Sequence, residues 1–195
     1  IQGLYQFKPE LPFTPGSDVA GVVKKVGEGV SHLKVGQEVF GFVAHGGLAE
    51  EVLVPANACF PKPTQMDFPT AASFLMAYGT SYHALKDRGR LTEGETLLVL
   101  GASGGVGLAA VELGKLMGAK VIAAASTDEK LALRKEYGAD ETINYTTQDL
   151  KATIKEITAG NGVDVVYDPV GGVYSEAALR GTAWNGRFLV VGFAA

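Results

Sequence analysis

Residues 101–107, Gly-Ala-Ser-Gly-Gly-Val-Gly, form the strongest chemical motif in the sequence. An apolar run over 96–100 precedes them, and a segment with the periodicity of an amphipathic helix follows. In such a strand-turn-helix unit, small residues let the backbone approach a pyrophosphate, and the N-terminus of the helix faces its negative charge. We therefore interpret the motif as a dinucleotide-binding loop.

Positions within this loop have different expected roles. Ala102 and Gly104 allow the close approach of the backbone to phosphate, and Gly107 allows the helix to pack closely on the sheet. A tight turn without a ligand is the alternative interpretation, but the loop stands at the head of a series of five strands, which favours the binding role. The predicted cofactor-contacting residues are Ala102, Ser103, Gly104, Gly105, Val106 and Gly107.

The end of the second strand bears on the choice of cofactor. An acidic residue there grips the ribose of NAD, whereas this chain has Ala-Ala-Ala-Ser over 123–126. Lys130 lies one helical turn further and can neutralise a 2′-phosphate, so the pattern predicts NADP(H). Two alternatives stay open: Lys130 is an ordinary solvated lysine, or Asp128 is a ribose ligand rather than a favourable charge at a helix start.

Two kinds of element pattern follow one another along the chain. Up to residue 64 the pattern predicts short strands, for example at 19–26, 38–43 and 49–54. From residue 93 onward, helical patterns alternate with apolar runs at 96–100, 120–124, 141–145, 163–167 and 187–191. This alternation predicts an α/β fold, a doubly wound parallel sheet with right-handed crossover helices on both faces.

The boundary between these halves is expected in a helix that follows a proline-rich stretch. This helix carries Ala71, Leu75 and Tyr78 on one face, and we expect domains over 1–75 and 76–195. In the second domain, Gly118 and Gly160 are expected to end the helices that precede them.

Composition excludes several classes of protein. The 195 residues are 47% hydrophobic, which is typical of a soluble globular protein, and no apolar run is long enough to span a membrane. Seventeen basic and 21 acidic residues give a net charge of −4, which disfavours nucleic-acid binding or a basic membrane surface. Because Cys59 is the only cysteine and the opening residues lack a signal-peptide pattern, we expect a reducing, cytoplasmic location.

Several motifs together resemble one family. They are Pro-Phe-Thr-Pro-Gly-Ser-Asp-Val-Ala-Gly-Val-Val at 12–23, the Val35-Gly36 turn, Gly-Gly-Leu-Ala-Glu at 46–50, and the loop at 101–107. The sequence resembles the medium-chain dehydrogenase/reductase superfamily, in particular its zinc-independent, zeta-crystallin-like NADPH:quinone oxidoreductase branch. The resemblance implies a mostly-β GroES-like domain followed by a Rossmann domain. Both would be truncated: an N-terminal segment and the sixth strand of the Rossmann sheet are expected to be missing.

The resemblance also implies roles for residues outside the glycine loop. It places Thr80 at the nicotinamide or diphosphate of the cofactor, and Ser126, Lys130 and Tyr145 around the 2′-phosphoadenosine. An ordinary strand-end aromatic is the alternative for Tyr145. The residues expected to border the nicotinamide ribose are Val170, Phe193 and Ala194, and Tyr5 is expected near the substrate pocket, with plain packing as its alternative.

The resemblance further implies a reaction without metal. Zinc-dependent members have His-Glu where this chain has Ser17-Asp18, and a serine cannot replace the histidine ligand. The spacing of His32, His45 and His83 does not suggest convergence, and His83 is expected to pack within the boundary helix.

The first functional hypothesis is therefore an NADPH-dependent reductase of quinones or other conjugated carbonyls. No residue stands out as a catalytic acid, and the oxygen that gains charge can take its proton from water. The same scaffold would serve an enoyl-thioester reductase or a non-enzymatic NADPH-binding structural or regulatory protein. A zinc alcohol dehydrogenase is disfavoured. The expected partner is a small quinone or enone substrate, and a homodimer stays open.

Overall fold

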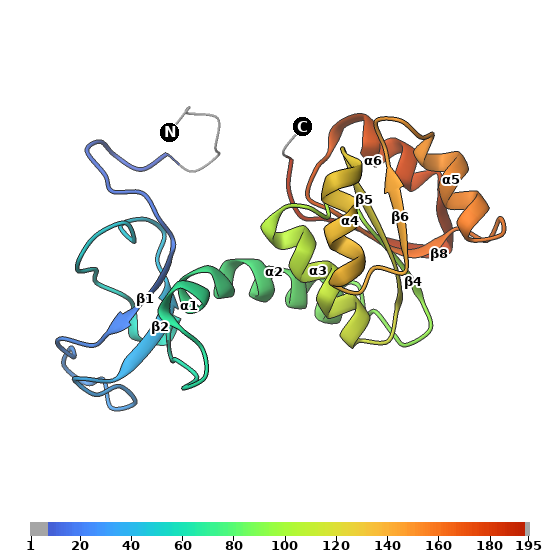
Figure 1. The fold of residues 1–195 in the computed structure, drawn as a ribbon. Coiled ribbons are helices and arrows are strands. Elements are labelled where there is room, and N and C mark those ends of the chain that lie inside the picture. Colours follow the sequence, from blue (N-terminus) through green and yellow to red (C-terminus); the bar gives the residue numbers. More distant parts are fainter. Residues whose placement is uncertain (1–7, 194–195) are drawn as a thin grey trace. The chain divides into compact units, whose positions relative to one another are not determined.

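The computed structural model of the chain describes residues 8–193, apart from the side chain of Leu133. Contacts between residues divide the chain into two compact units, residues 1–76 and 77–195. The division falls between Met76 and Ala77, inside a succession of helical segments (Figure 1).

The first unit contains a small antiparallel sheet of three strands in the order β1-β2-β3. The strands are β1 (Asp18–Val22), β2 (Glu38–Phe42) and β3 (Cys59–Pro61), and a short 3₁₀ helix, η1 (Ala56–Ala58), leads into β3. In the centre, Gly41 pairs with Val19 and with Cys59. A side chain at Gly41 would come within 2.6 Å of the Ala58 carbonyl oxygen, so the close approach of β2 and β3 requires glycine there.

A helix packs against this sheet and ends the first unit. Helix α1 (Phe68–Phe74) begins at Asp67, whose carboxylate accepts a hydrogen bond of 2.8 Å from the backbone N–H of Thr70. Phe74 meets Phe40 of β2 edge to face, with ring centroids 6.2 Å apart. The π-helical segment η2 (Leu75–Gly79) follows α1 directly and contains the division between the units.

The second unit is built on a parallel sheet of five strands in the order β6-β5-β4-β7-β8. Every neighbouring pair is parallel, which confirms the predicted α/β fold. The strands are β4 (Thr96–Val99), β5 (Lys120–Ala125), β6 (Glu141–Asn144), β7 (Val163–Asp168) and β8 (Thr182–Val190). Chain order runs outward from β4 in both directions, so the order reverses between β4 and β7, beside the loop at 101–107.

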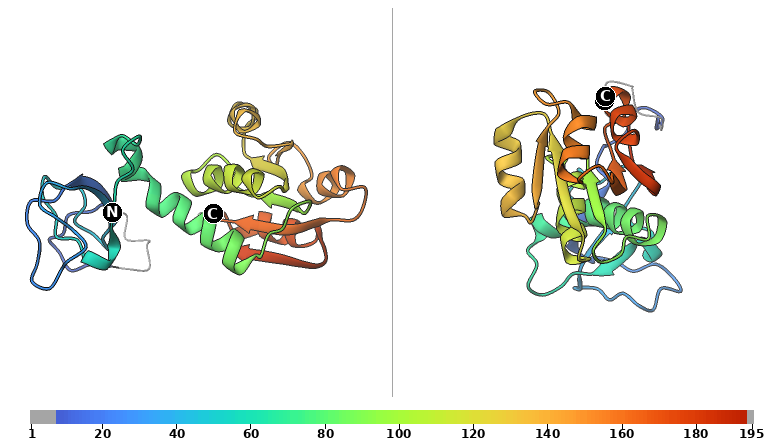
Figure 2. Two further views of the ribbon diagram at one scale, coloured as in Figure 1. Left: turned by 90° about the horizontal axis from the view of Figure 1, so that it is seen from below. Right: turned by 90° about the vertical axis from the view of Figure 1, so that its right-hand side faces the viewer.

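Helices cover both faces of this sheet (Figures 1 and 2). Alternate residues of each central strand face opposite sides: Leu97 packs in the core with α3, and Leu98 packs in the core with α5 and α6. Glycines Gly118 and Gly160 have φ of +82° and +86° at the ends of α3 and α5, as their sequence positions suggested. The helices are α2 (Thr80–Tyr82), the π-helical η3 (His83–Arg88), α3 (Gly105–Leu116), α4 (Asp128–Glu136), α5 (Leu150–Ile157) and α6 (Gly172–Leu179).

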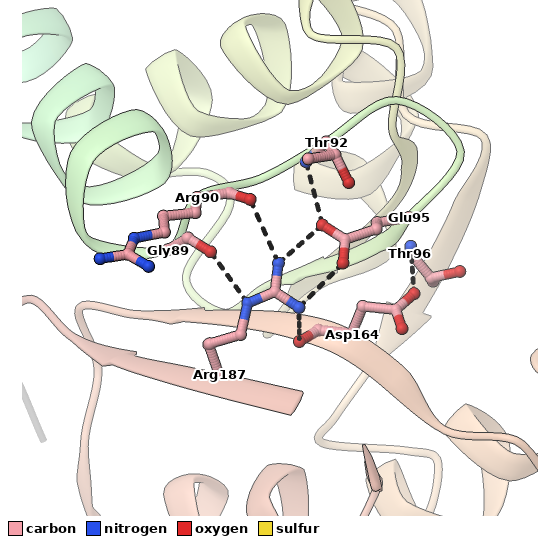
Figure 3. Close-up of polar contacts among 7 residues, drawn as sticks. All are labelled: Gly89, Arg90, Thr92, Glu95, Thr96, Asp164 and Arg187. Atoms are coloured by element: carbon pink, nitrogen blue, oxygen red, sulfur yellow. Dashed lines mark hydrogen bonds and ion pairs between the residues drawn. The ribbon is translucent and has the colours of Figure 1, made fainter. Parts of the chain in front are cut away.

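A network centred on Arg187 joins β8 to the segment that precedes β4 and to the neighbouring strand β7 (Figure 3). The Arg187 guanidinium donates to both carboxylate oxygens of Glu95, at 2.9 and 2.6 Å, and to the Gly89 carbonyl oxygen at 2.9 Å. Asp164 of β7 accepts from the backbone N–H of Thr96 at 2.8 Å. The hydrogen bond from Arg187 is the main cause that lowers the pKa of Glu95. The network fixes the start of β4, at the edge of the sheet opposite the glycine loop.

Three details differ from the sequence-based expectation. Residues 49–54 form no strand, because their backbone pairs with no neighbour in the described part of the first unit and Leu53 is 94% exposed. A strand lies instead at β3, and β1 ends at Val22 rather than at 26. Strand β8 begins at Thr182, five residues before the predicted start, because an irregularity in its pairing with β7 interrupts the apolar pattern. Within residues 8–193 no helix is long and apolar enough to cross a membrane.

Candidate functional site

The loops at the carboxyl ends of the five parallel strands contain most of the sequence-predicted site residues. The glycine loop follows β4, Ser126 follows β5, Tyr145 follows β6, and Val170 and Phe193 follow β7 and β8. Because all five strands are parallel, these loops share one edge of the sheet, where ligands of doubly wound sheets bind.

Some positions of the glycine loop need a glycine for packing within the protein, whereas others have open space beside them. A side chain on Gly107 would lie 2.3 Å from the Gly101 carbonyl oxygen, so only glycine lets α3 approach the loop this closely. Ala102 is fully buried, and its N–H donates to the Ala124 carbonyl oxygen at 3.0 Å. A side chain on Gly104, in contrast, would meet its nearest atom at 3.5 Å, and one on Gly105 would meet nothing within 4 Å.

The N-terminus of α3 is suited to an anion. Gly104 occupies the N-cap position and provides no side-chain hydrogen bond to the first turn of the helix. Backbone N–H groups at an uncapped helix start are available to phosphate oxygens, and the helix dipole favours their negative charge. The loop therefore fits a pyrophosphate in both space and charge.

A second cluster at this edge consists of Ser126, Lys130 and Tyr145. The Lys130 ammonium donates to the Ser126 hydroxyl at 3.3 Å, and the Tyr145 hydroxyl bonds the same side chain. Burial is the main cause that raises the pKa of Tyr145, and nearby Tyr174, 4.2 Å away between ring centroids, raises it further. Tyr145 is thus protonated at neutral pH, and a cation and two hydroxyl groups lie together at this edge of the sheet.

Asp128, the alternative ribose ligand, is already engaged. One of its carboxylate oxygens accepts a hydrogen bond of 2.8 Å from the side-chain amide of Asn144. Thr127 supplies the N-cap of α4 by accepting from the backbone N–H of Lys130 at 3.4 Å.

The helix that carries Thr80 is attached to the start of α3. Its neighbour Ser81 is fully buried, and the Ser81 hydroxyl bonds the Val106 carbonyl oxygen and the Tyr167 hydroxyl, each at 2.9 Å. Burial raises the pKa of Tyr167, so this phenol stays neutral within the core. Thr80 therefore lies beside the glycine loop. Sequence reasoning did not single out Ser81, because a serine in a helix has no distinctive pattern before its tertiary partners are known.

A buried aspartate shapes the loop after β7. The Asp168 carboxylate accepts from the backbone N–H groups of Val170 and Gly171, at 2.8 and 2.9 Å, and from the Ser175 hydroxyl. Sequence reasoning missed Asp168, although an aspartate directly before Pro-Val-Gly-Gly is a turn signal that could have found it. Val170 is held against the glycine loop, since a side chain on Gly101 would come within 2.7 Å of its methyl group.

Of the other residues predicted near the nicotinamide or the substrate pocket, the structure describes only Phe193. Phe193 is 72% exposed, and its backbone lies close to Gly171, at the same edge as Val170. Ala194 and Tyr5 lie outside the described residues.

In the first unit, Ser17 and Asp18 form hydrogen bonds with residues distant in the sequence. The Ser17 hydroxyl donates to the Ala44 carbonyl oxygen at 3.4 Å, and the Asp18 carboxylate accepts from the backbone N–H of Met76 at 3.1 and 3.2 Å. Burial raises the pKa of Asp18, while the hydrogen bond from Met76 lowers it.

The three histidines have separate local contacts. His32 bonds the Ala56 carbonyl oxygen at 2.9 Å, His45 meets Phe13 edge to face, and His83 bonds Asp87 at 2.7 Å. The expectation that His83 packs inside the boundary helix is wrong: its side chain is 64% exposed, because it pairs with Asp87 one turn along the outer face. Over residues 8–193 no group of three or more His, Cys, Asp or Glu side chains is arranged to hold a metal ion.

Comparison with known proteins agrees with a chain of two different domains. Residues 1–64 match the alcohol dehydrogenase GroES-like domain, and residues 105–195 match the family described as zinc-binding dehydrogenase. A quinone oxidoreductase-like protein 2 homolog from Nematostella vectensis is 44% identical over 194 residues, covering 98% of this chain and 53% of the relative.

Solved structures give the same result. A quinone oxidoreductase from Escherichia coli, complexed with NADPH, has a TM-score of 0.89 at 35% identity, covering 94% of this chain and 56% of that one. The CurK enoyl reductase has a TM-score of 0.85 at 35% identity, covering 90% and 53%. The chain spans little more than half the length of the curated relatives named as quinone oxidoreductases or their homologues.

A GroES-like domain followed by a Rossmann sheet, with a glycine loop at its carboxyl edge, defines a class of dinucleotide-dependent dehydrogenases and reductases. The chain belongs to this class, the medium-chain dehydrogenase/reductase superfamily. Its relatives assign it to the quinone oxidoreductase-like branch, as the sequence motifs indicated.

Proposed function

We propose that the protein is an NADPH-dependent oxidoreductase that transfers hydride to a quinone or another conjugated carbonyl without zinc. The observation that carries this proposal is the convergence of Ser126, Lys130 and Tyr145 at the same sheet edge as the glycine loop. A cation with two hydroxyl groups matches a 2′-phosphate, which NADPH has and NADH lacks.

Different residues of the chain bind different parts of the cofactor. The N–H groups at the start of α3 hold the pyrophosphate, and the Lys130 cluster holds the 2′-phosphate. Thr80, Val170 and Phe193 border the nicotinamide end. Ser81 fixes the helix that carries Thr80, and Asp168 fixes the loop that carries Val170. When bound, NADPH supplies the hydride, while the protein orients the reacting groups and limits access of water.

The absence of zinc is part of the proposal. Ser17 stands where zinc-dependent members have a histidine ligand. Its hydroxyl donates a hydrogen bond to the Ala44 carbonyl oxygen. Without a Lewis acid, the substrate must be one whose product oxygen is stabilised by conjugation, as in a quinone or an enone, and can take its proton from water.

An enoyl-thioester reductase is the second candidate. The likeness to the CurK enoyl reductase favours it, and a conjugated thioester satisfies the same chemical requirement. A non-enzymatic NADPH-binding protein would have the same cofactor site but no turnover.

Oxidation of NADPH, followed by absorbance with purified protein, tests these possibilities. Turnover with simple quinones and none with enoyl thioesters supports the proposal, and the reverse favours the second candidate. Tight NADPH binding with no turnover on either acceptor would contradict both enzymatic assignments.

The setting of this activity is proposed as well. One cysteine, Cys59, which is buried, suits a reducing compartment, and we propose the cytoplasm. A homodimer is compatible with this function, and light scattering on the purified protein measures it directly.

A further inference from the structure

A buried asparagine, Asn144, is the last residue of β6 and pairs with Ala125 at the end of β5. Asn144 is only 6% exposed, and its side-chain oxygen accepts from the backbone N–H of Thr146 at 3.1 Å. Since that backbone group can only donate, the orientation of the side-chain amide is fixed by this contact. The NH₂ group must therefore point the other way, where it donates to Asp128 at 2.8 Å.

Asp128 occupies a sensitive position. It is the first residue of α4, two residues after Ser126 and two before Lys130, the groups assigned to the 2′-phosphate. A carboxylate free to turn toward that cluster would repel a phosphate of nearly two negative charges, but would accept a hydrogen bond from an unmodified ribose. The same acid can thus oppose NADPH and favour NADH, according to where it is held.

We propose that Asn144 is a positioning residue for cofactor selectivity, which holds the Asp128 carboxylate away from the cluster of Ser126, Lys130 and Tyr145. This inference rests on the proposed function. The amide of Asn144 both accepts from Thr146 and donates to Asp128. An ionised aspartate at position 144 could accept but would repel Asp128, and an apolar residue could do neither.

A second contact supports this role. The Thr146 hydroxyl lies 2.7 Å from the Asn144 side-chain oxygen and 2.9 Å from the Ser126 carbonyl oxygen. Thr146 and Asn144 therefore connect the loop after β6, which carries Tyr145, to the end of β5. The Asn144 side chain of this connection bonds Asp128, one of the two acids among residues 126–130. The other acid, Glu129, follows Asp128 in the first turn of α4.

The test is to measure the dissociation constants of NADPH and NADH for four proteins by calorimetry. These are the wild-type chain, Asn144→Ala, Asp128→Asn and the double variant. We expect Asn144→Ala to raise the dissociation constant of NADPH about tenfold and that of NADH less than about twofold. Asp128→Asn alone should change neither by more than about threefold, because its charge is already held by Asn144.

The double variant separates charge from structural damage. Removal of the Asp128 charge should restore NADPH binding in the Asn144→Ala background, whereas a displaced loop would stay displaced. The inference is overturned if Asn144→Ala keeps the wild-type ratio of the two constants, if the double variant stays as weak as the single one, or if Asp128→Asn alone tightens NADPH markedly.

Two further variants keep the experiment decisive. Gln148→Ala removes the acceptor of the Asn144 backbone N–H and leaves its side chain untouched, so it should keep the wild-type ratio. If Asn144→Ala melts too low to titrate, Asn144→Ser replaces it with the same expected ratios, because a serine hydroxyl is too short to reach Asp128.

Failure of the wild-type chain to bind NADPH would contradict the proposed function itself, whereas selective wild-type binding with unaffected variants contradicts only this inference.

Discussion

In the proposed site, single residues at the carboxyl edge fall into two groups, those proposed to contact the cofactor and those that hold the others in place. Gly104 and Lys130 belong to the first group, since the one leaves space beside the backbone and the other provides a positive charge. Gly107 and Asp168 belong to the second, because their contacts are made within the protein. Substitutions in the two groups should therefore have different effects on binding and on stability.

Replacing Lys130 by alanine should weaken NADPH binding and leave NADH binding almost unchanged. Loss of one charge-assisted contact to the 2′-phosphate costs about 1.5–3 kcal/mol, roughly ten- to a hundredfold in affinity. Calorimetric titration with both cofactors measures this. Lys135→Ala is the matched control, because Lys135 is also exposed on α4 but lies in its last turn. Equal losses in the two variants would mean that net charge, rather than a contact of Lys130, is responsible.

Two glycines of one loop should respond in opposite ways. Gly104→Val has space within the protein and an extended backbone that valine adopts readily, so the protein should fold, with cofactor binding reduced by orders of magnitude. Gly107→Ala places a methyl group 2.3 Å from a carbonyl oxygen and should lower the melting temperature. Fluorescence titration and a thermal melt on each sample separate the effects. Near wild-type NADPH affinity with an unchanged melt in Gly104→Val would show that this loop is not the phosphate site.

At the scale of elements, the parallel sheet was predictable because buried parallel strands are short continuous apolar runs, such as Leu97 to Val99. The first unit was harder to predict, because its strands are short and half exposed. The extended stretch at 49–54 has strand-like composition but no pairing partner among the described residues, and composition alone does not reveal pairing.

In the candidate site, too, some residues could be predicted from the sequence and others could not. The glycine loop could be predicted because its chemistry is local, a turn between adjacent elements. Asn144 and Ser81 were missed, because each acts through a partner at least 16 residues away in the chain. Their roles depend on tertiary contacts that no local pattern contains.

The Arg187 network should contribute to stability at the edge opposite the site (Figure 3). Arg187→Met leaves Glu95 and three backbone carbonyl groups without their donor, and should lower the free energy of unfolding by about 2–3 kcal/mol. Arg180→Met, which breaks an exposed ion pair with Glu176 on α6, should cost no more than about 0.5 kcal/mol. Chemical denaturation measures both. A similar cost for the two variants would contradict the assigned role of Arg187.

The stabilisation by this network should depend on pH in a defined direction. Because Arg187 lowers the pKa of Glu95 in the folded state, the contribution is fully present above the ordinary carboxyl pKa of 4.5 and is lost as pH falls through the lower folded value. The difference in unfolding free energy between wild type and Arg187→Met should therefore be constant from pH 7 to about 5 and shrink below about 4.5. A difference that grows on acidification would contradict this assignment.

For the whole molecule, the first unit bears on whether a metal takes part. We predict that purified protein contains no stoichiometric zinc, since Ser17 replaces a histidine ligand and Cys59 is the only thiol. Elemental analysis measures this, with a zinc alcohol dehydrogenase carried through the same purification as the control. One zinc ion per chain, lost on substitution of Asp18 or His45, would overturn the metal-free mechanism.

The most direct measurement is a calorimetric titration of the wild-type chain with NADPH and with NADH under identical conditions. Binding at the glycine loop with the 2′-phosphate at Lys130 predicts one site per chain, with NADPH bound about tenfold more tightly or better. Equal affinity for the two cofactors would contradict the assignment of the Ser126, Lys130 and Tyr145 cluster, and binding of neither would contradict the proposed function as a whole.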